Sequence, residues 1–350
     1  MPLFRRRQAP DPTRDHAAGA VVDFWAWWSA EGGAAVDAAI TDGDPGREVE
    51  AISKRVGAMH PELDWELGPG SLSRHQLVVS AGGDPALRAL ARRWLRAAPA
   101  PTTVWEYADL RGPSTDLGGQ TLSVGGRDLP FSEVVLTARR QRTRLDVTLF
   151  HPLFADVDDH TRLQLTFLAL DATLGEADVE TWIGEIVPAT HRPMDAFPLE
   201  HLRGLVTDLA ADHLDDHGAP TWAILQGEGP RGQILVTARS VLASVQAPDL
   251  DRHVAIAVPF SEQTEAGFPG ERSLDALRAL EDHLVDRLGT GGLLLAHATE
   301  AGVRTLHFYV DGAGPGEEVL RTAVSGWTEG RVRIDAEPDP GWRAVAPFRG

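Results

Sequence analysis

The C-terminal part of the chain alternates apolar and polar side chains with the period of a β-strand, and this pattern constrains the fold most. Residues 253–258, 293–299 and 303–310 each carry apolar side chains at alternate positions, as strands do when a sheet is buried on one face. A leucine stripe at helical spacing, from Leu274 to Leu288, separates the first strand from the second. We therefore expect a sheet whose one face lies beneath helices.

A second helix follows these strands. Gly314-Pro315 marks its start, because proline is favoured in the first turn of a helix, and residues 331–337 form a last strand. The resulting order is strand, helix, strand, strand, helix, strand. That order is typical of the ferredoxin-like split βαβ arrangement, in which the helices pack on one face of an antiparallel sheet. The residues expected on the helix-covered face are Val254, Ile256, Val258, Leu294, Ala296, Leu306 and Phe308.

The opposite face of this sheet is expected to carry His253, His297, His307 and Tyr309. In a hairpin centred on Ala301, position 307 faces 295 and position 297 faces 305, which places both histidines on one face. Imidazole and aromatic groups on an uncovered sheet face suit a ligand or partner surface. The alternative is that this face packs against the first lobe and that hydrogen bonds satisfy these groups.

The N-terminal half has a similar order of elements. Helical spacing over residues 21–40, 49–59 and 85–98 and strand patterns over 63–67, 76–80 and 103–109 suggest a related lobe, offset by about 230 residues. Between the lobes we expect a hairpin of residues 133–139 and 145–150 and a central strand over 163–170. The predicted class is α+β in two lobes. The predicted divisions are a disordered tail over 1–19, an N-terminal lobe over 20–188, a linker and connecting helix over 189–220, and a C-terminal lobe over 221–350.

Composition narrows the class of protein. The 350 residues include no cysteine, which excludes disulfides, thiolate metal sites and cysteine nucleophiles. Acidic residues exceed basic ones by 51 to 33, giving a net charge of −18, and such an excess opposes nucleic-acid binding. The local cluster Arg139, Arg140, Arg142 and Arg144 leaves phosphate-backbone binding as an alternative. No export signal or membrane-spanning run is recognised, so we expect a cytoplasmic protein.

His213 and His217 are spaced as two metal ligands on one helix face would be. However, Leu214 stands where a zinc protease has its glutamate. His213 also continues an apolar stripe, and Gly218 ends the predicted helix. Histidines near a helix C-terminus are common because they interact favourably with the helix dipole. We therefore prefer a structural role and keep a metal site as the alternative.

Three further motifs are weaker. The acidic cluster at 156–160 lacks the glycine that an EF-hand loop needs at its turn, and in the cluster at 42–46 Gly46 replaces a ligand. The glycine-rich residues 312–316 follow a strand of an antiparallel hairpin, whereas phosphate-binding loops follow a strand of a parallel βαβ unit. Glu317 and Glu318 come directly after this run and would repel an anion. We therefore interpret both acidic clusters as solvated loops and do not expect residues 312–316 to bind a nucleotide.

Several short motifs resemble those of the domain-of-unknown-function family 695. They are Trp222, the step from Gly302 into His307-Phe308-Tyr309, and Asp339-Pro340-Gly341-Trp342. The resemblance covers about residues 222–348. In that family a Gly-Arg-like step precedes an aromatic strand end, whereas this chain has Gly302-Val303-Arg304, a departure of one residue in spacing.

Two upstream segments, residues 24–28 and 170–176, are similar to parts of bacterial proteins that join such a domain to a second lobe. The family has no established activity, so the resemblance implies a fold and the kind of protein in which the domain occurs. It implies no chemical activity. In topology the domain is similar to small acidic regulators that bind larger enzymes.

We therefore expect a bacterial, non-enzymatic binding or regulatory module that acts through protein or small-ligand contacts and needs no cofactor. The alternative is a metal-dependent or histidine/carboxylate hydrolase with its site between the lobes. The sequence leaves the ligand, the partner, any catalytic residue and the oligomeric state open.

Overall fold

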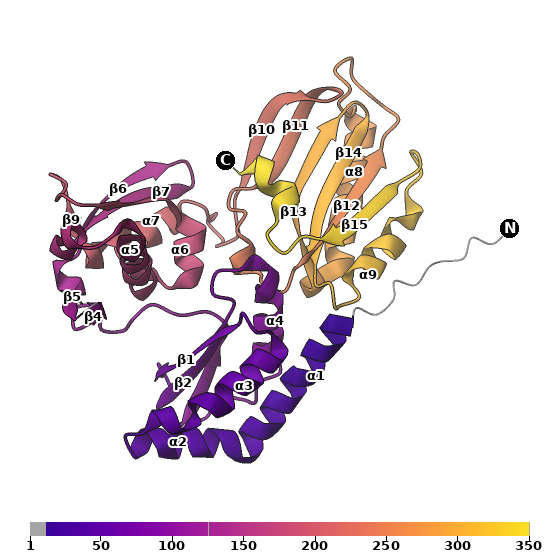
Figure 1. Ribbon diagram of the computed structural model, residues 1–350. Helices are drawn as coiled ribbons and strands as arrows, with labels where there is room; N and C mark the ends of the chain where they lie inside the picture. Colours follow the sequence, from indigo (N-terminus) through magenta and orange to yellow (C-terminus); the bar gives the residue numbers. More distant parts are fainter. Residues whose placement is uncertain (1–11, 125, 350) are drawn as a thin grey trace. The chain divides into compact units, whose positions relative to one another are not determined.

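The computed structural model describes residues 12–124 and 126–349, and its fold is a mixed α+β one with several separate sheets. Figure 1 labels the helices and strands. The chain divides into two compact units between Arg111 and Gly112, and each is described by itself. No helix within the described residues is both long and apolar enough to cross a membrane.

The first unit packs four helices against a small sheet. Its strands β1 (Asp64–Pro69) and β2 (His75–Ser80) are antiparallel, and β3 (Trp105–Ala108) runs parallel to β2. The helices are α1 (Pro12–Trp27), α2 (Gly33–Thr41), α3 (Val49–Met59) and α4 (Pro85–Arg96). The core is rich in aromatic side chains and includes Phe24, Trp25, Trp28, Trp94 and Trp105.

The helix predicted over 21–40 is confirmed, although one turn of it is widened. A π-helical turn, Trp28–Gly32, joins α1 to α2. Gly32 faces the ring of Trp27 so closely that a Cβ atom there would lie 2.7 Å from it, so a larger residue at this turn would displace the ring. The helix also begins earlier than predicted: residues 12–19, placed in a disordered tail, form the first turns of α1. Residues 1–11 of that tail lie outside the described residues.

The second unit begins with the hairpin of β4 (Thr121–Val124) and β5 (Arg127–Pro130) and a sheet in the order β8-β7-β6-β9. These strands are β6 (Val135–Gln141), β7 (Arg144–Phe150), β8 (Ile183–Ala189) and β9 (Phe197–Pro198). The accompanying helices are α5 (Asp159–Leu174), α6 (Glu176–Trp182) and α7 (Leu202–Ala211). The predicted hairpin of residues 133–150 is therefore confirmed.

One prediction in this region was wrong. Residues 163–170 lie in α5 and do not form a central strand. Leu165 and Ala169 are buried there whereas Phe167 is exposed. Apolar side chains therefore lie on both faces of this helix, and they give the same continuous apolar run in the sequence as a buried strand does. The helix predicted within residues 189–220 is confirmed as α7, and Leu202 and Val206 of α7 belong to the core that α5 also joins. The same segment also contributes β9.

The C-terminal sheet has the order β10-β11-β13-β14-β12-β15, and each neighbouring pair in it is antiparallel. Its strands are β10 (Trp222–Gly229), β11 (Gly232–Arg239), β12 (Arg252–Pro259), β13 (Gly292–Glu300), β14 (Val303–Val310) and β15 (Arg333–Pro338). The helices α8 (Glu271–Leu288) and α9 (Gly316–Ala323) cover one face (Figure 1). Leu306 and Phe308 are fully buried beneath them, which confirms the predicted alternation in β14. Ala296, predicted on the same face, is instead buried in the core of the opposite face with Tyr309, so that prediction was wrong.

The predicted relationship between the two ends of the chain does not extend to strand pairing. In the first unit, β2 and β3 flank α4 in the sequence and lie side by side in parallel. In the C-terminal sheet, β14 and β15 flank α9, and β12 lies between them. The two regions therefore share an order of elements but form different sheets, because hydrophobic periodicity in the sequence does not show which strands pair.

Candidate functional site

A β-bulge in β13 decides which histidines share a face of the C-terminal sheet. The register between β13 and β14 shifts between Leu294 and Ala296, so that His307 lies opposite Ala296 and His297 lies opposite Leu306. Leu306 belongs to the helix-covered face, and directly opposed residues point to the same side of a sheet. His297 therefore lies on the helix side, and the prediction that it shares a face with His307 was wrong. The extra residue of a bulge reverses the alternation beyond it.

His253, His307 and Tyr309 do lie together on the other face, which we call the histidine face. His253 is opposite Tyr309 across β12 and β14. A hydrogen bond of 3.0 Å joins Nε2 of His253 to Nδ1 of His307, and the two rings stack at 5.2 Å between centroids. The hydroxyl of Tyr309 donates to Oδ2 of Asp339 over 2.5 Å. The three predicted groups thus form one network of hydrogen bonds and ring contacts, because the rings of His253 and Tyr309 also contact each other at 5.1 Å between centroids.

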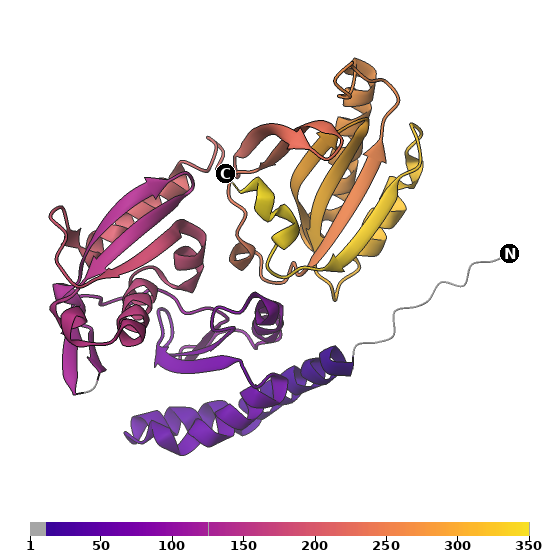
Figure 2. The same ribbon diagram turned by 45° about the horizontal axis from the view of Figure 1, so that its top comes forward.

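The chain's own C-terminal segment, residues 339–348, packs against this network. Figure 2 shows the segment as the yellow end of the ribbon. Asp339 accepts hydrogen bonds of 2.9 Å from the backbone N–H groups of Arg343 and Ala344. Trp342 is 2% exposed and donates through Nε1 to the carbonyl of Leu250 over 2.9 Å. The ring of Phe348 contacts His307 edge-on at 5.3 Å. The histidine face is therefore not an uncovered surface.

Burial controls the protonation of these groups. It lowers the pKa of His307 to about 3, with the neighbouring imidazoles of His253 and His297 adding to the shift, and it lowers that of His253 as well. It also lowers the pKa of His297 to about 4, with a further contribution from the nearby Arg304. Burial raises the pKa of Tyr309. All three imidazoles are consequently neutral at pH 7. His253 and His307 hydrogen-bond to each other, whereas Nδ1 of His297 is buried without a hydrogen-bond partner.

The predicted histidine pair at 213 and 217 is not on one helix face. The helix α7 ends at Ala211, and residues 213–218 form a turn. His213 stacks on Trp182 at 5.7 Å, and burial lowers its pKa, whereas His217 is exposed. Across residues 12–124 and 126–349, no group of three or more histidine or carboxylate side chains is placed to hold a metal ion.

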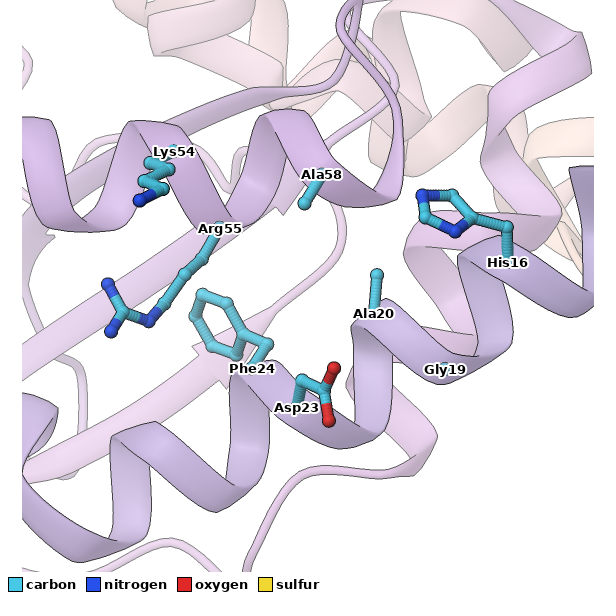
Figure 3. Close-up of a pocket in the computed structure, with 8 residues that line it drawn as sticks. All are labelled: His16, Gly19, Ala20, Asp23, Phe24, Lys54, Arg55 and Ala58. Carbon is cyan, nitrogen blue, oxygen red and sulfur yellow. The ribbon is translucent and has the colours of Figure 1, made fainter.

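In the first unit, an open groove of about 530 Å³ lies between α1 and α3 (Figure 3). Its floor includes Phe24 and Ala20, and charged groups from both helices line it, among them Asp23 and Lys54. The guanidinium of Arg55 stacks on the ring of Trp27 at 3.9 Å and donates to the carbonyl of Ala51, so it supports the helix pair. The groove can admit a small apolar group between opposite charges.

A carboxylate of the first unit occupies a cradle of backbone amides that could otherwise bind an anion. Glu106 accepts from the backbone N–H groups of Ser71, Leu72 and Ser73 and from the hydroxyl of Ser71. The hydrogen bond from Ser71 is the largest cause that lowers the pKa of Glu106 to about 2. The cradle is therefore filled by the protein itself, and its role is to order the loop before β2.

The surface that sequence reasoning missed is the outer edge of β10. Trp222 and Ile224 are 44% and 69% exposed and lie on the same side of this strand. Across the sheet, Ile224 is opposite Thr237, and Thr237 is opposite His297, so the predicted residue His297 lies in the same row as Ile224. The sequence does not reveal that β10 lies at the edge of the sheet, because that depends on the pairing of β11 with β13, far away in the sequence.

Comparison with curated proteins and with solved structures gives no match for the chain. Its C-terminal region does match one family model. Residues 233–348, which include the histidine face and the segment that covers it, match the model of the family of unknown function DUF695.

Proposed function

We propose that the chain is a polypeptide-binding module that adds a strand of a partner protein to the outer edge of β10. The observation that carries this proposal is that the outer edge of β10 is not paired with another strand. Within the described residues, the eight-residue strand β10 pairs with β11 on one side and has no strand on its other side. Unpaired backbone N–H and C=O groups along an exposed edge are a template for another strand.

The register of the hairpin identifies the groups that point outward. A two-residue turn, Pro230 and Arg231, connects Gly229 to Gly232, so this closing pair is hydrogen bonded. Hydrogen-bonded and non-hydrogen-bonded pairs then alternate along the strands. The backbone groups directed away from β11 are accordingly those of Trp222, Ile224, Gln226 and Glu228.

The opposite edge of the same sheet is built differently. The strand β15 has six residues, carries Arg333, Asp335 and Glu337 at alternate positions, and ends at Pro338. Alternating charges, short length and proline are the features with which proteins protect an edge strand from further pairing. In β10 the corresponding alternate positions include the exposed Trp222 and Ile224. The contrast within one sheet supports β10 as the binding edge.

The strand order also supports a ferredoxin-like interpretation of the C-terminal lobe. The order β13-β14-β12-β15, with α8 between β12 and β13 and α9 between β14 and β15, is the split βαβ pattern. In this interpretation β11 and β10 extend the basic sheet by a hairpin, and the binding edge is the outer strand of that addition.

Replacing Gln226 with proline tests the proposal. The N–H of Gln226 points away from β11, so proline removes an outward donor and leaves the hairpin bonds in place. We expect a capped eight-residue peptide of alternating valine and threonine to bind the unaltered chain, and Gln226→Pro to weaken that binding at least about tenfold. Leu72→Lys, which changes an exposed leucine of the first unit, serves as the control.

Isothermal titration measures the affinities, and circular dichroism checks that each variant is folded. Equal binding by the unaltered chain and Gln226→Pro, or no binding by the unaltered chain, would contradict the proposal.

A further inference from the structure

We infer, resting on the proposed function, that the partner strand runs antiparallel to β10, with apolar side chains opposite Trp222 and Ile224 and a basic side chain opposite Glu228. Antiparallel pairing is chosen because it is more common and slightly more stable per residue than parallel pairing. From the N-terminus to the C-terminus of the partner strand, the four side chains that face β10 are therefore basic, polar, apolar and apolar. They lie opposite Glu228, Gln226, Ile224 and Trp222, in that order.

The apolar half of this pattern follows from exposure. Ile224 and Trp222 are 69% and 44% exposed, and the guanidinium of Arg239 lies 5.9 Å from the ring of Trp222. Side chains directly opposite each other on one face of an antiparallel pair contact each other, and aromatic or β-branched pairs stabilise the sheet. Valine or tyrosine opposite these two residues would remove their apolar surface from water.

The basic position follows from the charge of Glu228. Its side chain is exposed, and across β11 it lies opposite the uncharged Gln233. The nearby Arg231 pairs with Glu300, over 3.1 Å between Nε and Oε2. Among the residues that the structure describes, Glu228 has no ion-pair partner, so an added strand with a cation at this position would provide one. The net charge of −18 also favours a basic partner.

A second copy of the chain fits this edge poorly. Full overlap of two antiparallel β10 strands places Trp222 of one copy opposite Glu228 of the other, and Ile224 opposite Gln226. Each apolar side chain would then meet a polar one. Two chains of charge −18 would also repel each other. A strand from a different, basic protein satisfies both conditions.

A charge exchange between peptide and protein tests the inference. The probe is a capped peptide with arginine, threonine, valine and tyrosine at alternate positions and threonine between them. A second peptide has glutamate in place of arginine. We expect the arginine peptide to bind about fivefold more tightly to the unaltered chain, and Glu228→Lys to reverse the preference. Glu228→Gln, a nearly isosteric variant, should remove the preference without abolishing binding.

The possible outcomes separate the two proposals. If both peptides bind with equal affinity to all three chains, and NMR shows that the amides of Ile224 and Gln226 become protected from exchange, the charge inference is wrong and the binding edge stands. If neither peptide protects these amides, the proposed function itself fails. Concentration-dependent dimerisation that Gln226→Pro removes would show that the partner is a second copy, which overturns the inference.

Discussion

The histidine face and the β10 edge belong to one sheet, but the chain covers the first and leaves the second unpaired. The histidine face carries His253, His307 and Tyr309, and residues 339–348 cover it with hydrogen bonds and an indole ring. The β10 edge carries Trp222 and Ile224, and the described part of the chain places no strand against it. The histidines and the tyrosine therefore lie where this sheet is covered, and Trp222 and Ile224 lie where its edge is open.

This difference changes where function should be sought. Histidines on a sheet face suggest chemistry when considered in the sequence, but burial keeps them neutral and hydrogen bonds engage them. An isoleucine in an edge strand suggests nothing in the sequence, but here it is 69% exposed beside outward-pointing backbone groups. Four predictions test the contrast, beginning with the largest expected effect.

Replacing Trp342 with alanine should destabilise the protein most. The substitution removes a ring that packs against Tyr309 at 5.1 Å and the hydrogen bond to Leu250. We expect the free energy of unfolding to fall by about 3–5 kcal/mol, measured by urea denaturation. Ile224→Ala at the exposed edge should change it by less than about 1 kcal/mol. Similar losses for the two variants would remove the distinction between covered and open surfaces.

Asp339→Ala should have the next largest effect. This carboxylate accepts from two backbone amides and from the hydroxyl of Tyr309, so its removal leaves three donors without that acceptor. We expect a loss of about 2–3 kcal/mol. Tyr309→Phe, which removes one of the three hydrogen bonds, should lose about 1 kcal/mol. The two values are compared by thermal unfolding, and a larger loss for Tyr309→Phe would contradict this role of Asp339.

The histidine face should also make stability depend on pH. Burial holds the pKa of His307 at about 3 in the folded protein, whereas an unfolded histidine titrates near 6.5. Between these values the unfolded state binds the proton and the folded state does not, so stability falls as the pH decreases from about 6.5 toward 3. The slope contributed by His307 is at most about 1.4 kcal/mol per pH unit.

His307→Gln should therefore flatten the dependence of the unfolding free energy on pH between 4 and 6.5. Urea denaturation at several pH values measures this dependence, and His217→Gln, at an exposed turn, is the matched control. An unchanged slope in His307→Gln would show that this imidazole takes up its proton in the folded state.

Ile224→Lys should have the smallest effect on stability. The side chain is mostly exposed, so we expect a change within about 0.5 kcal/mol. A lysine on an edge strand opposes pairing with another strand, and the variant should therefore lose peptide binding while it stays folded. Chemical denaturation and titration with the valine–threonine peptide measure both properties. A strongly destabilised variant would mean that Ile224 is part of the core.

The sequence predicts the C-terminal sheet well for a clear physical reason. Strict alternation around Val254, Ile256, Leu306 and Phe308 reports a half-buried strand, and short turns such as the one at Ala301 favour antiparallel neighbours. The same reasoning fails over residues 163–170, where a helix that is apolar on two faces resembles a buried strand. Local pattern predicts an element when one face is buried and fails when both faces carry apolar side chains.

The candidate site was less accessible to prediction, because it depends on non-local geometry. A one-residue bulge beside Leu295 moves His297 to the other side of the sheet. The motif from Asp339 to Trp342 was recognised as a family resemblance, but its position over Tyr309 appears only in the folded chain. Pairing with distant strands likewise makes β10 an edge. None of these features leaves a periodic signal.

Residue-resolved hydrogen exchange of the peptide-free protein tests the central claim most directly. The backbone amides of Ala223 and Leu225 point toward β11, and those of Ile224 and Gln226 point away from it. We predict slow exchange for the first pair and fast exchange for the second, alternating along β10. Uniformly slow exchange along the strand would show that this edge is already covered, and it would contradict the account.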